Sequence, residues 1–154
     1  MLFQNTILAG VVSLASLASA GIVSFTIPKT IVPGAKFTAT LTENNATKSN
    51  DISIAFGIAS GPYVEPFGLG TDLLGKSILT NTDITPSPET VDVELTLPEY
   101  YGKGEAVVVA SINSVLGARL TPIVSLYNAT VTVGDEASTE TVKSGEVLTI
   151  QHQY

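Results

Sequence analysis

Beyond residue 20, apolar and polar residues alternate with a period of two over several segments. This alternation is the pattern of a β-strand with one buried face. Ala106–Ala110 is instead apolar throughout, which indicates a central strand buried on both faces. The segments predicted as strands are Gly21–Ile27, Lys36–Thr42, Asp51–Ile58, Val91–Leu97, Ala106–Ala110 and Tyr127–Val133.

The alternation also predicts which side chains face the core. Asp92 and Glu94 fall on the opposite, solvent-exposed face of their strand, and Asn128 and Thr130 do the same in theirs. The side chains predicted to point inward are Val23, Phe25, Ile27, Phe37, Ala39, Leu41, Ile52, Ile54, Phe56, Ile58, Val91, Val93, Leu95, Leu97, Tyr127, Ala129, Val131 and Val133.

Proline and glycine separate these segments at intervals typical of short strands joined by turns. No amphipathic stretch is long enough to form a helix. Leu69–Leu79 contains Gly70 and Gly75, so at most one short helical turn is expected there. We therefore predict an all-β fold, an immunoglobulin-like antiparallel β-sandwich of about seven strands.

Two segments have an irregular composition. Gly61–Gly75 is rich in proline and glycine and is predicted to be the longest loop, the kind of segment that carries function in sandwich proteins. The polar residues 136–154 are predicted to form a C-terminal tail, in which Val147–Ile150 adds an edge strand. The sandwich domain is accordingly predicted to span residues 21–135.

The first 20 residues have the features of a secretory signal peptide. Ile7–Leu17 is a short apolar run, and Ala18-Ser19-Ala20 gives the small-residue pattern after which signal peptidase cleaves. A membrane anchor needs about 20 apolar residues, and no second run approaches that length. We expect a secreted protein that begins at Gly21 and has no stable membrane insertion.

Composition excludes several classes of function. The chain of 154 residues has a formal net charge of −7, which disfavours nucleic acid and anionic membranes as partners. It has no cysteine, which excludes disulfides and Cys-based zinc sites. Its single histidine excludes a metal centre built from several histidines. No cofactor or metal is expected.

Two sequons, Asn45-Ala46-Thr47 and Asn128-Ala129-Thr130, fit the secretory route. Asn45 lies in a polar run that is typical of an exposed loop. Asn128 lies on the predicted solvent face of its strand. Both asparagines are therefore candidate glycosylation sites.

The sequence carries no recognisable catalytic arrangement, and we expect no enzymatic activity. The histidine, His152, is third from the C-terminus, a poor position for a catalytic triad that needs rigid geometry. Asp135 and Glu136 lack the spacing of a calcium loop. The carboxylates available for glycosidase chemistry form no paired motif; they are Glu65, Asp72, Asp92, Glu94, Glu99 and Glu105.

Carbohydrate binding is an alternative function, since secreted sandwiches often stack sugars on exposed aromatic rings. Tryptophan is absent, and the aromatic residues available are Tyr63, Phe67, Tyr100, Tyr101 and Tyr154. We favour the interpretation that Tyr63 and Phe67 close one end of the core and that Tyr100 and Tyr101 form a corner at a strand edge. The alternative is a secreted protein that binds the cell wall or carbohydrate.

Specific strings resemble a known family. They are Ile31–Gly34, Ile52–Ala59, a loop that ends at Leu69-Gly70, and Tyr127–Asp135. Their order and spacing are similar to those of the necrosis-inducing secreted protein family of filamentous plant-associated fungi. The resemblance runs from about Gly21 to Asp135.

The resemblance implies a secreted effector that acts by binding. Members of that family are described as associating with immune receptor-associated kinases of the host plant and suppressing pattern-triggered immunity, and some provoke cell death. A cytoplasmic kinase target implies entry into the host cell. The sequence leaves the oligomeric state open.

Two surfaces are candidates for partner binding. The first is the Gly61–Gly75 loop with Tyr63, Val64 and Phe67, because exposed aromatic residues make interface anchors. The second is the outer face with Asp92 and Glu94, whose charge would steer a basic partner.

Overall fold

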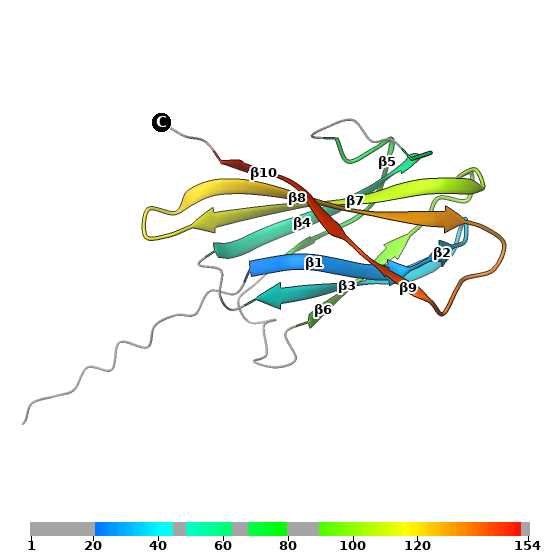
Figure 1. Cartoon of the computed structure of the whole chain (residues 1–154), viewed down its shortest axis with the longest axis horizontal. Helices are drawn as coiled ribbons and strands as arrows, with labels where there is room; N and C mark the ends of the chain where they lie inside the picture. Colours follow the sequence, from blue (N-terminus) through cyan, green and yellow to red (C-terminus); the bar gives the residue numbers. More distant parts are fainter. Residues whose placement is uncertain (1–20, 45–48, 63–67, 80–89, 152–154) are drawn as a thin grey trace, which may run out of the picture.

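The computed structural model describes residues 21–44, 49–62, 68–79 and 90–151, and they form two β-sheets packed face to face (Figure 1). One sheet has the strand order β6-β3-β1-β9, and the other has the order β10-β8-β7-β4-β5 with β2 paired to β8. All pairings are antiparallel except β2 with β8. The predicted all-β sandwich is confirmed.

Ten strands are assigned within the described residues, and four of them, β2, β5, β9 and β10, lie outside the six segments that alternation identified. The strands are β1 (Gly21–Pro28), β2 (Thr30–Ile31), β3 (Lys36–Asn44), β4 (Ser49–Ser60), β5 (Asp72–Ile78), β6 (Thr90–Thr96), β7 (Gly104–Leu116), β8 (Thr121–Val133), β9 (Thr141–Lys143) and β10 (Gly145–Gln151).

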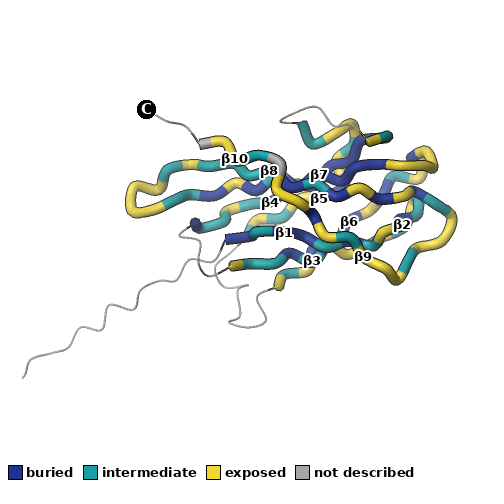
Figure 2. The backbone as a smooth tube through the Cα atoms, viewed as in Figure 1, coloured by how far each residue is buried: buried dark blue, intermediate teal, exposed yellow. Residues whose placement is uncertain are grey.

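The main core lies between the sheets, as the dark segments of Figure 2 show. At its centre Phe25 of β1 meets Phe56 of β4 edge to face, with ring centroids 5.4 Å apart. A second, smaller cluster on the outer face of the larger sheet contains Val107, Val109 and Leu126. Strand β7 is therefore buried on both sides, as the apolar run Ala106–Ala110 predicted.

Two core predictions were wrong, and both errors have the same cause. Val23 is only half-buried and Ile52 is 46% exposed, whereas the neighbouring Ile22 is buried. The strand register shifts between Ile22 and Ser24 in β1, and between Asp51 and Ser53 in β4. Each shift is a β-bulge, which inserts one residue and turns the preceding side chain inward.

The segment Leu69–Leu79 contains a strand in place of the expected short helical turn. Strand β5 pairs with β4 along the sheet edge, so the irregular part of the predicted Gly61–Gly75 loop ends before Asp72. The preceding residues pack closely on β4, because Leu69 lies against Gly57.

The segment predicted as a polar tail, residues 136–154, contains two strands. Strand β9 pairs with β1 and strand β10 pairs with β8, so the segment crosses from one sheet to the other. The crossing is visible as the orange-to-red ribbon in Figure 1. The expected edge strand at Val147–Ile150 is confirmed, and sheet structure extends beyond residue 135 to Gln151.

We predict that Gly57→Ala lowers the free energy of unfolding by about 1–3 kcal/mol, the usual cost of overpacking. A Cβ at this position would collide with the backbone carbonyl of Leu69, which cannot move as a flexible side chain can. Chemical denaturation measures the change. Gly102→Ala is the control, because its Cβ would meet nothing within 4 Å. Equal stabilities of the two variants would contradict the close contact.

Candidate functional site

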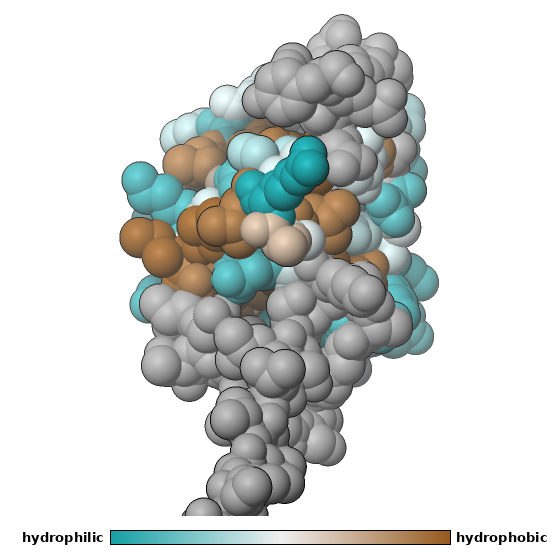
Figure 3. Space-filling view, turned by 90° about the vertical axis from the view of Figure 1, so that its left-hand side faces the viewer, coloured by the Kyte–Doolittle hydropathy of each residue, from teal (hydrophilic) through white to brown (hydrophobic). Residues whose placement is uncertain are grey.

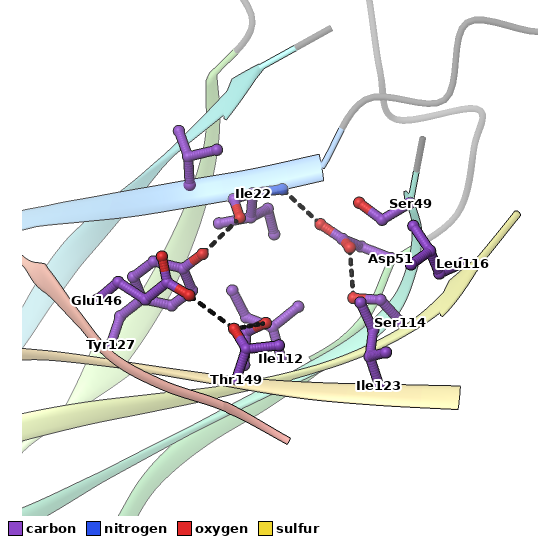
Figure 4. A pocket seen from close by; sticks show the side chains of 12 residues that line it. Ile22, Ser49, Asp51, Ile112, Ser114, Leu116, Ile123, Tyr127, Glu146 and Thr149 are labelled. Carbon is purple, nitrogen blue, oxygen red and sulfur yellow. Dashed lines mark hydrogen bonds between the residues drawn. The ribbon is translucent and has the colours of Figure 1, made fainter. Parts of the chain in front are cut away.

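A pocket of about 240 Å³ opens between the two sheets at the end where β1 and β4 begin and β7 turns into β8 (Figure 4). Five strands contribute to its walls. They supply Ile22 and Val23 from β1, Ser49 and Asp51 from β4, Ile112, Ser114 and Leu116 from β7, Ile123, Ser125 and Tyr127 from β8, and Glu146 and Thr149 from β10.

The bulge in β4 gives Asp51 its position on one wall. The carboxylate accepts a hydrogen bond from the Ile22 N–H (2.6 Å) and another from the Ser114 hydroxyl (2.5 Å). Burial raises the pKa of the Asp51 carboxyl, and these two hydrogen bonds act in the opposite direction because they favour the charged form. Asp51 thus links β4, β7 and β1.

The opposite wall carries Tyr127, Glu146 and Thr149 (Figure 4). The Tyr127 hydroxyl donates to the carbonyl oxygen of Ile22 (3.1 Å), and the Thr149 hydroxyl donates to Glu146 (2.6 Å). Burial, with the charges of Glu146 and Asp51 nearby, raises the pKa of the Tyr127 phenol to about 12. The phenol is therefore a hydrogen-bond donor throughout the physiological range.

The outer-face candidates, Asp92 and Glu94, point to solvent as predicted, and each has a partner. Lys36 contacts Glu94 (2.7 Å), and the Thr40 hydroxyl donates to Asp92 (2.7 Å). Part of the negative charge on this face is thus balanced locally. This surface lies on the smaller sheet and contributes nothing to the pocket.

The loop candidates Tyr63, Val64 and Phe67 lie outside the described residues, as do Asn45 and its sequon. Asn128, the other candidate glycosylation site, is half-buried. It lies opposite Val109 of β7 and Gly145 of β10 in the sheet. The third residue of its sequon, Thr130, is exposed. Glycosylation at both asparagines remains a prediction.

The tyrosines considered for sugar stacking differ in exposure. Tyr100 is 78% exposed and its hydroxyl donates to Asp72 (2.5 Å). Tyr101 is buried, and its hydroxyl accepts a hydrogen bond from Ser60 (3.1 Å). The pair therefore forms a corner in which one ring packs in the core, and it presents a single aromatic face to solvent.

Within the described residues, no group of three or more His, Cys, Asp or Glu is arranged to hold a metal ion. In the same part of the chain, no helix is long and apolar enough to cross a membrane.

Sequence reasoning did not identify the pocket. Asp51 precedes a predicted core residue, so alternation assigned it to the face opposite Ile52, and only the bulge turns it inward. Glu146 belongs to the segment predicted as a tail. Asp51 follows a polar run in the sequence, Lys48-Ser49-Asn50, and nothing in that run distinguishes it from a solvent-exposed residue.

We predict that Tyr127→Phe lowers the free energy of unfolding by about 1 kcal/mol at neutral pH, because the Ile22 carbonyl loses its hydrogen bond. The folded pKa of about 12 exceeds the ordinary value near 10. The stabilisation from this phenol is therefore complete below pH ~10 and is lost as the pH rises through the folded value.

Ultraviolet titration of the folded protein, with denaturation at several pH values, measures both effects. Tyr127→Phe should remove the phenol that ionises near pH 12. Tyr100→Phe is the control, because its ring is exposed. An alkaline titration unchanged by Tyr127→Phe would contradict the assignment.

Comparison with known proteins identifies the family. The model of the Nis1 family matches residues 18–132. A necrosis-inducing secreted protein 1 from Colletotrichum orbiculare is 40% identical over 146 residues, covering 90% of this chain and 85% of the relative. A protein of the same name from Colletotrichum higginsianum is 34% identical over 139 residues, covering 90% and 94%. The chain therefore belongs to the Nis1 family of secreted, necrosis-inducing proteins.

Proposed function

We propose that this protein is a fungal effector that binds immune receptor-associated kinases of a host plant and suppresses pattern-triggered immunity, without catalysis of its own. Family membership is the observation that carries this proposal, because relatives named as necrosis-inducing secreted proteins match along 90% of the chain. A kinase target in the host cytoplasm requires entry into the host cell after secretion.

A binding role fits the physical character of the molecule. The sandwich carries at one end a pocket with polar and aliphatic walls. The net charge of −7 favours encounter with a basic surface on the partner. Because Lys36 offsets Glu94 on the outer face, that face is a weaker attractant than its acidic residues alone suggest.

We predict that purified residues 21–154 retain immune receptor-associated kinases in a pull-down and retain neither chitin nor glucan. Added soluble kinase should displace the retained kinase from the protein if the interaction is specific. Retention on insoluble glycans alone would overturn the proposal and would support the cell-wall alternative. The three baits should be compared at the same salt concentration, because steering by charge weakens with ionic strength.

We also predict that a variant with both Tyr63→Ala and Phe67→Ala loses kinase binding and keeps its thermal stability. This result follows from the expectation that the loop is exposed, because exposed aromatic residues supply binding energy at interfaces and little folding energy. The pull-down and a thermal melt measure the two effects. Tyr100→Ala is the matched control, an exposed aromatic outside this loop. Undiminished kinase binding by the double variant would exclude the loop as the binding surface.

A further inference from the structure

The walls of the pocket present hydrogen-bond acceptors, because their hydroxyl hydrogens are already used. Ser114 donates to Asp51, and Tyr127 donates to the Ile22 carbonyl. Thr149 donates to Glu146, which leaves Ser125 as the donor in its 3.1 Å contact with Thr149. Because these four hydroxyl hydrogens already bond to protein atoms, the hydroxyl groups can act only as hydrogen-bond acceptors toward a molecule in the pocket.

Ser49 provides an independent sign that the pocket receives a polar group. Its residue is 7% exposed and lines the pocket. Figure 4 shows its hydroxyl oxygen directed toward the centre of the pocket. Within the described residues this hydroxyl has no hydrogen-bond partner, and its oxygen is not fully buried, so it is available to a polar group that enters the pocket.

The charge of the pocket is negative. Asp51 and Glu146 stand on facing walls, and no lysine, arginine or histidine occurs among the described residues that line it. Arg119, on the neighbouring turn, is not one of the lining residues. The remaining walls are aliphatic and come from Ile22, Val23, Ile112, Leu116 and Ile123. A pocket that combines acceptors and carboxylates with aliphatic walls suits a cation on an aliphatic stem.

Hydrophobic side chains are exposed among polar ones at this end of the molecule. Figure 3 shows hydrophobic side chains gathered there. Leu120, in the β7–β8 turn, is 63% exposed. Leu120 has a φ of +53°, a conformation that leucine rarely adopts, and its N–H donates to the Gly117 carbonyl (3.1 Å). The turn therefore holds an aliphatic side chain in solvent beside an acidic pocket.

We propose that the pocket binds the side chain of a lysine or arginine that a partner protein presents between aliphatic residues. This inference deepens the proposed binding function by naming the feature of the partner that is recognised. The volume of about 240 Å³ is smaller than the range of roughly 300–1,000 Å³ for drug-sized ligands and suits a single long side chain. An aliphatic residue of the partner would cover Leu120.

The test uses a capped peptide of sequence leucine–lysine–leucine as the probe, and ¹H–¹⁵N NMR of residues 21–154 as the measurement. Saturable shifts are expected at the amides of Ile22, Ser114 and Thr149. A peptide with norleucine in place of lysine keeps the aliphatic stem without the ammonium, and it should produce no such shifts. Equal shifts from both peptides, or none from either, would overturn the proposal.

Glu146→Gln is the variant of choice, because Asp51 also holds β1 in place and its substitution risks unfolding. Loss of this charge should lower the affinity for the lysine peptide at least about tenfold. Glu105→Gln is the matched control: the residue is exposed, lies at the opposite end of β7 and does not line the pocket. Equal affinities of the two variants would overturn the proposal.

The kinase pull-down separates this inference from the proposed function. If kinase binds both variants equally well, the proposed function stands and the pocket is not the contact. If the lysine peptide binds in the pocket and no kinase is retained, the pocket stands and the kinase proposal fails. If the proposed function and the pocket inference both hold, Glu146→Gln should bind the kinase less well and Glu105→Gln should bind it as the unmodified protein does.

Discussion

The structure at the pocket end depends on how strand β1 is held by side chains from outside its own sheet. Asp51 and Tyr127, both from the larger sheet, bind the N–H and the carbonyl of Ile22. Ser144, between β9 and β10, accepts a hydrogen bond from the Phe25 N–H through its hydroxyl and donates its own backbone N–H to the Phe25 carbonyl. Hydrophobic contact between sheets has no direction, so these hydrogen bonds fix where β1 lies across the sandwich. The chain has no disulfide that could do so.

Much of the fold could be predicted from alternation, because most strands keep one face on the core without interruption. The inward residues of β8, from Tyr127 to Val133, are buried as predicted, and Leu95 and Leu97 are fully buried. Prediction failed at Ile52 because a bulge changes the face of every residue on one side of it. Strand β5 was missed because its glycine and lysine interrupt the apolar pattern, and it is held by pairing with β4.

The candidate site was beyond prediction for a different reason. Its acceptors come from three distant parts of the chain, represented by Asp51, Tyr127 and Glu146. Nothing in the spacing of these residues places them together; they meet because β10 pairs with β8 and because a bulge turns Asp51 inward. Composition argued only against anionic partners, through the net charge of −7. The pocket we propose as a cation site would give a basic partner a defined place to bind.

The same groups serve stability and recognition at this end of the sandwich, which constrains how the site works. Burial disfavours the charged form of Asp51, and the Ile22 N–H and Ser114 hydroxyl compensate this only in part, since its pKa remains raised. A lysine or arginine cation in the pocket would supply further compensation and favour ionised Asp51. Because such a ligand binds the folded state alone, its binding would also stabilise the attachment of β1. Binding of a partner in this pocket would thus stabilise the hydrogen bond between Asp51 and Ile22 that forms part of its wall.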